Sequence, residues 1–276
     1  MENERIAVSI ITIGDELMIG QVIDTNSAWI AQQLNAEGIW VKRRVAVGDD
    51  RNDIRKALDE EGLHSQIILI TGGLGPTADD ITKPLLSEYF GGKLITDEAV
   101  LKHVEQIFTR SGRPFTGRNI KQAEVPEGCE VLFNERGTAP GMWFEKAGRI
   151  YVAMPGVPYE MKGLMTNAVI PRLLKRFNTG NIIHQTLLTT GISESFLADH
   201  IAAWENELPS YIRLSYLPNF GMIRLRLTGL GADRQKLSDE MSAEFEKLKK
   251  LTAQWLAADE DITLSQLVTK MLRERK

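Results

Sequence analysis

The chain has 276 residues, of which 43% are apolar and 25% charged, and its formal net charge at pH 7 is −4. This composition is ordinary for a globular protein and excludes a disordered, collagen-like or fibrous chain. The negative net charge argues against a non-specific DNA or RNA binder, so no nucleic-acid partner is expected. Cys129 is the only cysteine, which excludes an internal disulfide and a cysteine-rich zinc site.

The N-terminal sequence does not have the features of a secretory signal. Residues 1–5 are mostly charged or polar and lead directly into a strand-like segment, without the apolar core and small-residue cleavage site of a signal peptide. No apolar run approaches the 18 residues of a membrane span. We therefore expect a cytoplasmic protein with no membrane partner.

The first part of the chain has the pattern of an α/β domain. The β-branched run 6–13 predicts a strand buried on both faces, and 39–47 and 66–70 predict two further strands. Helical patterns follow each strand, and Asn52 or Asp53 is the expected N-cap of the second helix. This alternation predicts a mostly parallel sheet with helices on both faces and right-handed crossovers.

The segment before residue 178 adds smaller elements. A helix is expected over 97–110, and the polar, turn-rich stretch 113–126 predicts a long loop or irregular arm. A second helix, over 159–177, contains Pro171, which is expected to kink or divide it. Short strands are predicted at 131–133, 142–144 and 150–154.

The sequence pattern changes at residues 178–181, which predict a linker. The strand, helix, hairpin and charged helix that follow, the last expected over 233–256, predict a small α+β domain of β-α-β-β-α order. An RNA-binding KH module needs a Gly-X-X-Gly loop, whereas the corresponding turn here ends in Glu194, so a structural or dimerising role is favoured. The expected parts are a domain at 1–177, a domain at 181–258, and a tail or the start of a missing module at 259–276.

A glycine-rich turn after the third strand is the strongest functional motif. Glycines let the backbone approach a phosphate, and a following helix N-terminus offers unpaired N–H groups. The spacing fits neither the Walker nor the dinucleotide pattern. The alternative is a tight turn with a capped helix, in which the two aspartates are favourable through the helix dipole. The residues concerned are Thr71, Gly72, Gly73, Gly75, Thr77, Asp79 and Asp80.

Two adjacent carboxylates would repel an anionic ligand unless a cation lies between them. Mg²⁺ is commonly held through one or two carboxylates plus phosphate oxygens, so Asp79 and Asp80 indicate a divalent metal site. No nucleophilic triad of serine, histidine and carboxylate stands out in the sequence.

Further polar loops are expected at the same sheet edge, because ligands of open parallel sheets lie beyond the carboxyl ends of the strands. For Asp24 alone, a helix N-cap is the favoured interpretation. Pro158 and Glu160 suit the start of a helix, which fully accounts for them. The other candidates are Gly14, Asp15, Glu16, Thr25, Asn26, Gly137, Pro155, Gly156, Asn119 and Lys121.

Taken in order, the motifs Gly14–Leu17, Asp24–Asn26, Thr71–Asp80, Gly137–Gly141 and Pro155–Pro158 resemble the N-terminal part of the CinA family, the competence/damage-inducible proteins. That part is similar to the molybdopterin-binding fold of MogA, MoaB and MoeA, followed by a KH-like domain. The resemblance covers roughly residues 5–260. Family members usually continue into an amidase domain that deamidates nicotinamide mononucleotide, an activity not expected of this chain, which ends about where that domain would start.

The resemblance implies an ADP-ribose pyrophosphatase that depends on a divalent metal, Mg²⁺ or Co²⁺, is favoured by K⁺, and yields AMP and ribose 5-phosphate. A diphosphate would lie over Gly72–Gly75, and Asp79 or Asp80, with Glu16, would hold the metal. Lys121 and Asn119 would neutralise or orient the leaving phosphate. The resemblance also implies a homo-oligomer, a dimer or trimer.

Two alternatives belong to other functional classes. The site binds or adenylylates molybdopterin, as cofactor-making relatives of this fold do, or the domain is a non-catalytic interaction module whose glycine-rich loop is only a turn. Pterin binding without turnover of ADP-ribose would favour the first. Unchanged thermal stability with nucleotide, metal or pterin would favour the second, because a ligand that binds the native state raises its stability.

Overall fold

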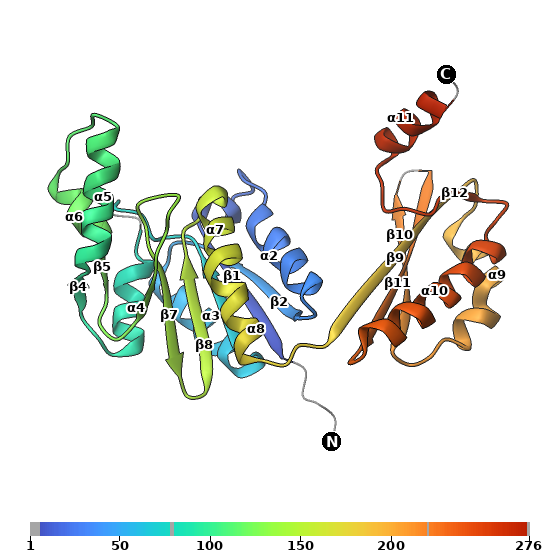
Figure 1. Cartoon of the computed structure of the whole chain (residues 1–276), viewed down its shortest axis with the longest axis horizontal. Helices are drawn as coiled ribbons and strands as arrows, with labels where there is room; N and C mark the ends of the chain where they lie inside the picture. Colours follow the sequence, from blue (N-terminus) through green and yellow to red (C-terminus); the bar gives the residue numbers. More distant parts are fainter. Residues whose placement is uncertain (1–5, 78–79, 220, 275–276) are drawn as a thin grey trace. The chain divides into compact units, whose positions relative to one another are not determined.

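The structure is a computed structural model that describes residues 6–77, 80–219 and 221–274 (Figure 1). The chain divides into two units, Met1–Thr179 and Gly180–Lys276, and each is described here by itself. Within the described residues, no helix combines the length and apolar character that crossing a bilayer requires.

The first unit is built on a six-stranded sheet of order β2-β1-β3-β8-β7-β6. The four strands β2, β1, β3 and β8 are parallel, and β7 and β6 continue the sheet antiparallel. The predicted, mostly parallel sheet is therefore confirmed. The strands are β1 (Ala7–Ile13), β2 (Trp40–Val47), β3 (Ile67–Thr71), β6 (Glu130–Leu132), β7 (Gly141–Lys146) and β8 (Arg149–Met154).

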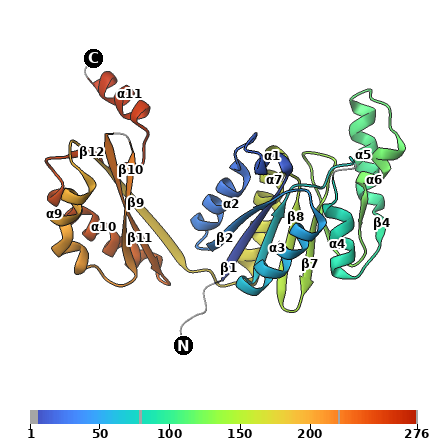
Figure 2. The same cartoon turned by 180° about the vertical axis from the view of Figure 1, so that it is seen from behind.

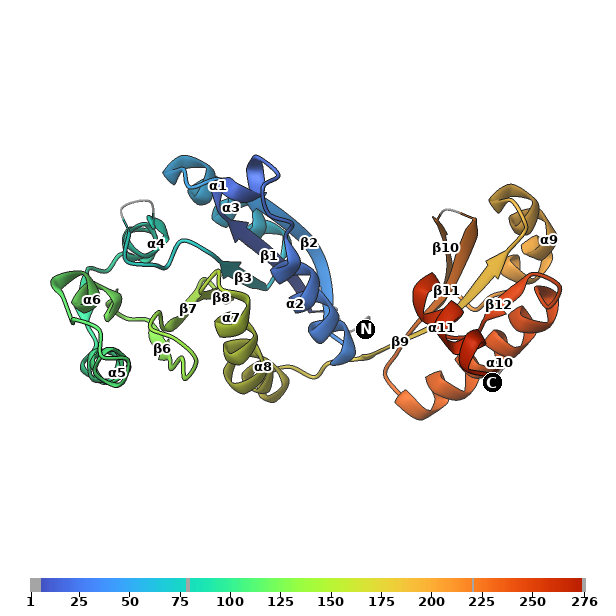
Figure 3. The same cartoon turned by 90° about the horizontal axis from the view of Figure 1, so that it is seen from above.

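Helices cover both faces of this sheet (Figures 2 and 3). Apolar residues of β1, β3 and β8 alternate between two cores, one beneath each helical layer, which is why these strands are apolar on both faces. One layer consists of α2 (Thr25–Ala36), α7 (Pro158–Leu164), the π-helical turn η1 (Met165–Val169) and α8 (Ile170–Arg176), and the other of α3 (Arg51–His64) and α4 (Thr82–Phe90).

Two helices differ in detail from the sequence prediction. The helix expected over 159–177 is divided by η1 just before Pro171, whose missing N–H and ring prevent the regular α-helical bond at that point. The N-cap of α3 is Asp50, which accepts from the N–H groups of Asn52 and Asp53, so the caps predicted at those two residues were wrong.

The stretch 94–126, here called the arm, is more regular than predicted. It contains β4 (Leu94–Thr96), α5 (Glu98–Arg110), α6 (Gly117–Gln122) and β5 (Glu124–Pro126), with β4 and β5 paired antiparallel. The expected irregular loop at 113–126 is therefore corrected to a short helix and a strand. A small apolar cluster of α5 and Ala123 holds the two helices of the arm together.

The second unit is a four-stranded sheet of order β10-β11-β9-β12 with two helices on its apolar core. The predicted β-α-β-β-α order is present. The charged helix predicted over 233–256 ends at Leu251, and the chain then adds a fourth strand. The elements are β9 (Asn181–Thr190), α9 (Glu194–Asn206), β10 (Ile212–Asn219), β11 (Met222–Gly231), α10 (Arg234–Leu251) and β12 (Leu256–Ala258), followed by α11 (Leu264–Glu274).

Candidate functional site

The carboxyl ends of β1, β2, β3 and β8 meet at one sheet edge and enclose a cavity of 410 Å³. Parallel strands end on the same side, so the loops that follow them converge there without further help from the sequence. The helix α6 of the arm and the loop between β6 and β7 close the other side. The cavity brings together Gly14, Glu16, Asp49, Gly72, Gly73, Gly75, Asp80, Gln122, Thr138, Pro155, Gly156 and Glu160.

The glycines of the loop after β3 are required by the loop itself. Gly72 and Gly73 have φ angles of 117° and 65°, which side-chain-bearing residues rarely adopt. A Cβ atom on Gly72 would overlap the carbonyl oxygen of Ile13, and one on Gly73 would overlap the Thr82 hydroxyl. The tight-turn interpretation therefore explains these glycines in full.

Asp80 fastens this loop. Its Oδ1 accepts from the Gly75 N–H at 2.8 Å, and its Oδ2 accepts from the Thr77 N–H at 3.0 Å and from the Thr77 hydroxyl. The helix α4 begins two residues later, at Thr82. Asp80 thus reaches the cavity with a carboxylate that is already oriented, and Asp79 lies outside the described residues.

Four carboxylates line the cavity: Glu16, Asp49, Asp80 and Glu160. No lysine or arginine is among the described residues that line it, so an anionic ligand there needs a cation to offset the charge. No group of three or more His, Cys, Asp or Glu within the described chain is arranged to hold a metal by itself. The residues fit a metal that shares its coordination with phosphate oxygens, since Mg²⁺ is commonly bound through one or two carboxylates plus phosphate.

Glu16 and Asp15 follow β1 and play different parts. The Glu16 carboxylate lies against Gly14, where a Cβ atom would meet it. Within the described part of the chain it has no hydrogen bond or ion pair. The Asp15 Oδ1 instead accepts from the Asp49 N–H at 2.9 Å, while the Asp15 N–H donates to the Asp49 carboxylate at 3.0 Å. Asp15 therefore joins two loops, and Glu16 is the carboxylate available to a ligand.

Glu160 lines the opposite wall, and its surroundings favour its protonated form. Burial raises the pKa of Glu160, and a hydrogen bond from Asn134 opposes this in part. The Asn134 Nδ2 donates to Glu160 Oε2 at 2.6 Å and to the Ala139 carbonyl at 2.9 Å. A Cβ atom on Gly137 would overlap the Glu160 carboxyl. The sequence explained Glu160 as a helix-start residue and did not indicate its place in the cavity.

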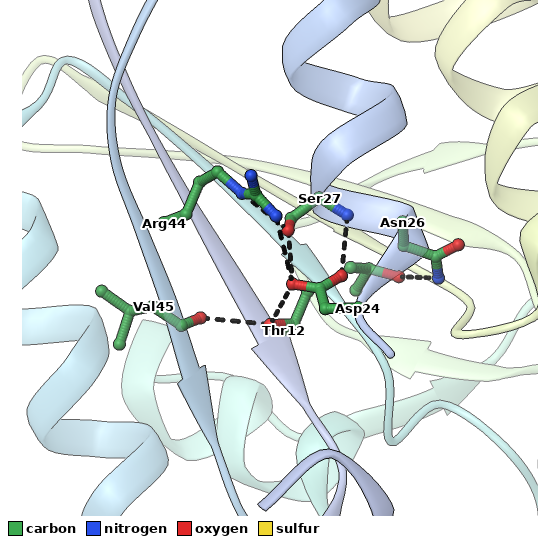
Figure 4. A network of polar contacts seen from close by, with 7 residues as sticks. Thr12, Asp24, Asn26, Ser27, Arg44 and Val45 are labelled. Atoms are coloured by element: carbon green, nitrogen blue, oxygen red, sulfur yellow. Dashed lines mark hydrogen bonds and ion pairs between the residues drawn. The ribbon is translucent and has the colours of Figure 1, made fainter. Parts of the chain in front are cut away.

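A smaller chamber of 120 Å³ adjoins the cavity and shares Ile13, Glu16 and Gly156 with it. Its wall contains Asp24 and Asn26. Figure 4 shows the polar contacts of Asp24 with Thr12 and Ser27. Asp24 is the N-cap of α2, as predicted, and accepts from the Ser27 N–H at 2.9 Å and the Thr12 hydroxyl at 3.1 Å. Thr25, the first residue of α2, lines the same chamber with its side chain exposed.

Asn26 joins the ends of β3 and β8. Its Nδ2 donates to the Gly156 carbonyl at 2.6 Å and lies 3.4 Å from the Thr71 hydroxyl, which itself donates to the Pro155 carbonyl at 2.9 Å. The Asn26 Oδ1 is buried, and no described residue forms a hydrogen bond with it.

The arm contributes different residues from those predicted. Asn119 is buried, and its Oδ1 accepts from the Thr116 N–H at 2.7 Å, so it caps α6. Lys121 is exposed and is not among the described residues that line the cavity. Gln122 lines the cavity instead. Lys83 contacts the end of α6, where its Nζ donates to the Lys121 and Gln122 carbonyls at 2.9 and 3.1 Å.

The position of Lys83 in its helix is a signal that the sequence alone carries. A cation in the first turn of a helix is opposed by the helix dipole, so a lysine there calls for a specific partner. Lys83 is only 5% exposed, and burial lowers its pKa to about 8, although the charges of Glu124 and Asp80 act in the opposite direction.

Comparison with known proteins identifies the family. Residues 9–175 match the model of the probable molybdopterin binding domain. The chain belongs to this family. It is 47% identical over 270 residues to a CinA-like protein of Flavobacterium psychrophilum, covering 97% of this chain and 65% of that protein. For a CinA-like protein of Cytophaga hutchinsonii the identity is 42% over 273 residues, with 99% and 65% covered.

A crystal structure of the protein CinA, of unknown function, from Thermoplasma acidophilum has the same fold. It is 32% identical, with a TM-score of 0.54, and the match covers 62% of this chain and 98% of that one. The CinA resemblance expected from the motifs is thus confirmed. The chain spans 65% of the length of the two curated relatives described above.

Proposed function

We propose that the first unit hydrolyses the phosphoanhydride bond of ADP-ribose, with a divalent cation, to AMP and ribose 5-phosphate. The observation that carries the proposal is a cavity walled by a glycine-rich loop and four carboxylates, with no described lysine or arginine in its lining. Such a wall accepts a diphosphate only together with a cation. The CinA resemblance supplies the identity of the substrate.

The residues that would hold the cation are Glu16 and Asp80, on two loops of the same cavity. The Glu16 carboxylate has no hydrogen bond or ion pair with the described residues, and Asp80 is oriented by Gly75 and Thr77. When bound, a divalent cation offsets charge on the diphosphate and polarises its phosphorus–oxygen bonds. Asp79 stays a proposed ligand outside the described residues.

Glu160 is the carboxylate best suited to take a proton. Its raised pKa brings it closer to the ordinary working pH, where a general base is most effective. In the reaction, the oxygen of a water molecule bonds to one phosphorus atom while the bridging phosphorus–oxygen bond breaks. The water proton goes to Glu160, and the bridging oxygen leaves with the other phosphate.

A second candidate function is the binding of molybdopterin. The match of residues 9–175 to the probable molybdopterin binding domain favours it. A cavity with a phosphate-approaching loop suits the phosphate of that compound as well as a diphosphate. A rise of Tm with a pterin phosphate, without AMP release from ADP-ribose, would select this function.

The test is AMP release from ADP-ribose with Mg²⁺ or Co²⁺ and K⁺, comparing wild type with Glu16→Gln. The variant keeps the shape of the side chain and removes its charge, so we expect kcat/KM to fall at least about 100-fold. Glu105→Gln, an exposed substitution on α5, is the matched control and should keep wild-type rates. Equal rates for Glu16→Gln and wild type would contradict the assignment of Glu16.

A further inference from the structure

The backbone of Gln122 is held in place at the end of α6, and the residue lines the cavity. The Lys83 Nζ donates to its carbonyl at 3.1 Å, and the carbonyl of the next residue, Ala123, accepts from the Asp97 N–H at 2.9 Å. The backbone on both sides of the side chain is thereby tied to other elements. Gln122 itself is 7% exposed.

The Oε1 atom of Gln122 is buried and has no hydrogen-bond partner among the residues that the structure describes. Native proteins leave few buried polar atoms unpaired, because such an atom loses its water without replacement. An alanine or leucine would fill this place without that cost. Gln122 lines the cavity, so turning its amide toward the cavity would let Oε1 accept from a donor of the ligand.

The chemistry of the ligand limits what that donor is. The phosphates of a nucleotide or pterin ligand are acceptors, so the donor belongs to the organic part. A planar amide pairs best with a planar partner edge, its oxygen accepting from an amino group while its nitrogen faces a ring nitrogen, as glutamine does with adenine. The smaller chamber, lined by Thr12, Thr25 and Asn26, is the better place for sugar hydroxyls.

We infer that Gln122 reads the exocyclic amino group of the ligand's heterocycle, with Lys83 as the residue that positions α6. This inference rests on the proposed function in so far as the heterocycle is the adenine of ADP-ribose. Pterins carry an exocyclic amino group too, so the same reading applies to the second candidate function. A ligand that lacks the amino group would leave Oε1 unpaired and bind less tightly.

The test combines a change in the protein with a change in the ligand. Wild type and Gln122→Met are compared on ADP-ribose and on its analogue with hydrogen in place of the adenine amino group. For wild type, we expect loss of the amino group to lower kcat/KM about tenfold, the worth of one hydrogen bond. For Gln122→Met, kcat/KM should be equal for the two substrates. Gln122→Glu keeps the acceptor and should retain the preference for ADP-ribose over the analogue.

Gln106→Met, an exposed change on α5, is the matched control and should behave as wild type. If removal of the amino group lowers kcat/KM equally in wild type and in Gln122→Met, the inference is overturned. If neither wild type nor the variants hydrolyse ADP-ribose, the proposed function fails. The inference about Gln122 is then tested by the Tm shifts produced by pterin and by lumazine, which has a carbonyl in place of the amino group. A pterin preference present in wild type and absent in Gln122→Met supports the reading of Gln122, and no preference overturns it.

Discussion

Glu160 shows how one side chain acquires a place in the cavity that its sequence position does not reveal. Its place in the first turn of α7 is fully explained by the helix dipole. Only the fold brings Asn134 and the Gly137 turn against it, and burial then raises its pKa. The same holds for Gln122, whose unpaired oxygen is a property of its surroundings.

The pH dependence of turnover tests the role of Glu160. A base must be deprotonated to act, so kcat should fall as the pH drops through the pKa of Glu160, which burial raises from its ordinary value. Glu160→Gln should lower kcat by about 10² to 10⁴-fold and abolish this acid limb, as measured by AMP release from pH 4.5 to 8. An unchanged acid limb in the variant would show that another group is the base.

At the scale of elements, the glycine-rich loop depends on backbone geometry more than on ligand contacts. Gly72→Ala places a methyl group on the Ile13 carbonyl at a φ of 117°, so we expect the free energy of unfolding to fall by more than about 2 kcal/mol. Gly91→Ala, at the end of α4, also has a positive φ of 82° but has no atom within 4 Å of the added Cβ. It should cost only about 1 kcal/mol. Similar losses in urea unfolding would refute the steric explanation.

The contact between α4 and α6 should make stability depend on pH. The pKa of Lys83 is lowered from 10.5 to about 8 in the folded chain, so between these values the unfolded chain binds more protons. The free energy of unfolding should therefore rise with pH over this window, by about 3 kcal/mol, from the contribution of Lys83. In Lys83→Met this rise should be absent. Parallel pH profiles for the two proteins would contradict the assignment.

The sequence was sufficient for the strands of the parallel sheet and insufficient for the arm. Continuous β-branched runs such as 6–13 have few alternatives to a buried strand. The pair β4–β5 and the helix α6 are short, and long-range contacts such as that of Lys83 with Gln122 stabilise them. Such contacts cannot be predicted from local sequence propensity. The sequence predicts Asn119 and Lys121 as site residues of the arm, whereas Gln122 is the described residue of the arm that lines the cavity.

At the scale of the whole molecule, every described residue that lines the cavity lies in the unit Met1–Thr179. The CinA chain of known structure corresponds to about this much of the protein, since 98% of it matches 62% of this chain. We therefore expect a fragment of residues 1–179 to fold and to hydrolyse ADP-ribose with a KM within about threefold of the whole chain. Loss of activity in a folded fragment, checked by circular dichroism, would show that the second unit completes the site.

The most direct test of the account is metal-dependent release of AMP. Purified protein is incubated with ADP-ribose and K⁺, with Mg²⁺ or Co²⁺ in one series and with a chelator in the other, and the products are separated by chromatography. The account predicts AMP and ribose 5-phosphate in the metal series and none with the chelator. Absence of AMP with either metal would contradict it, and equal release with the chelator would contradict the role given to the acid-lined cavity.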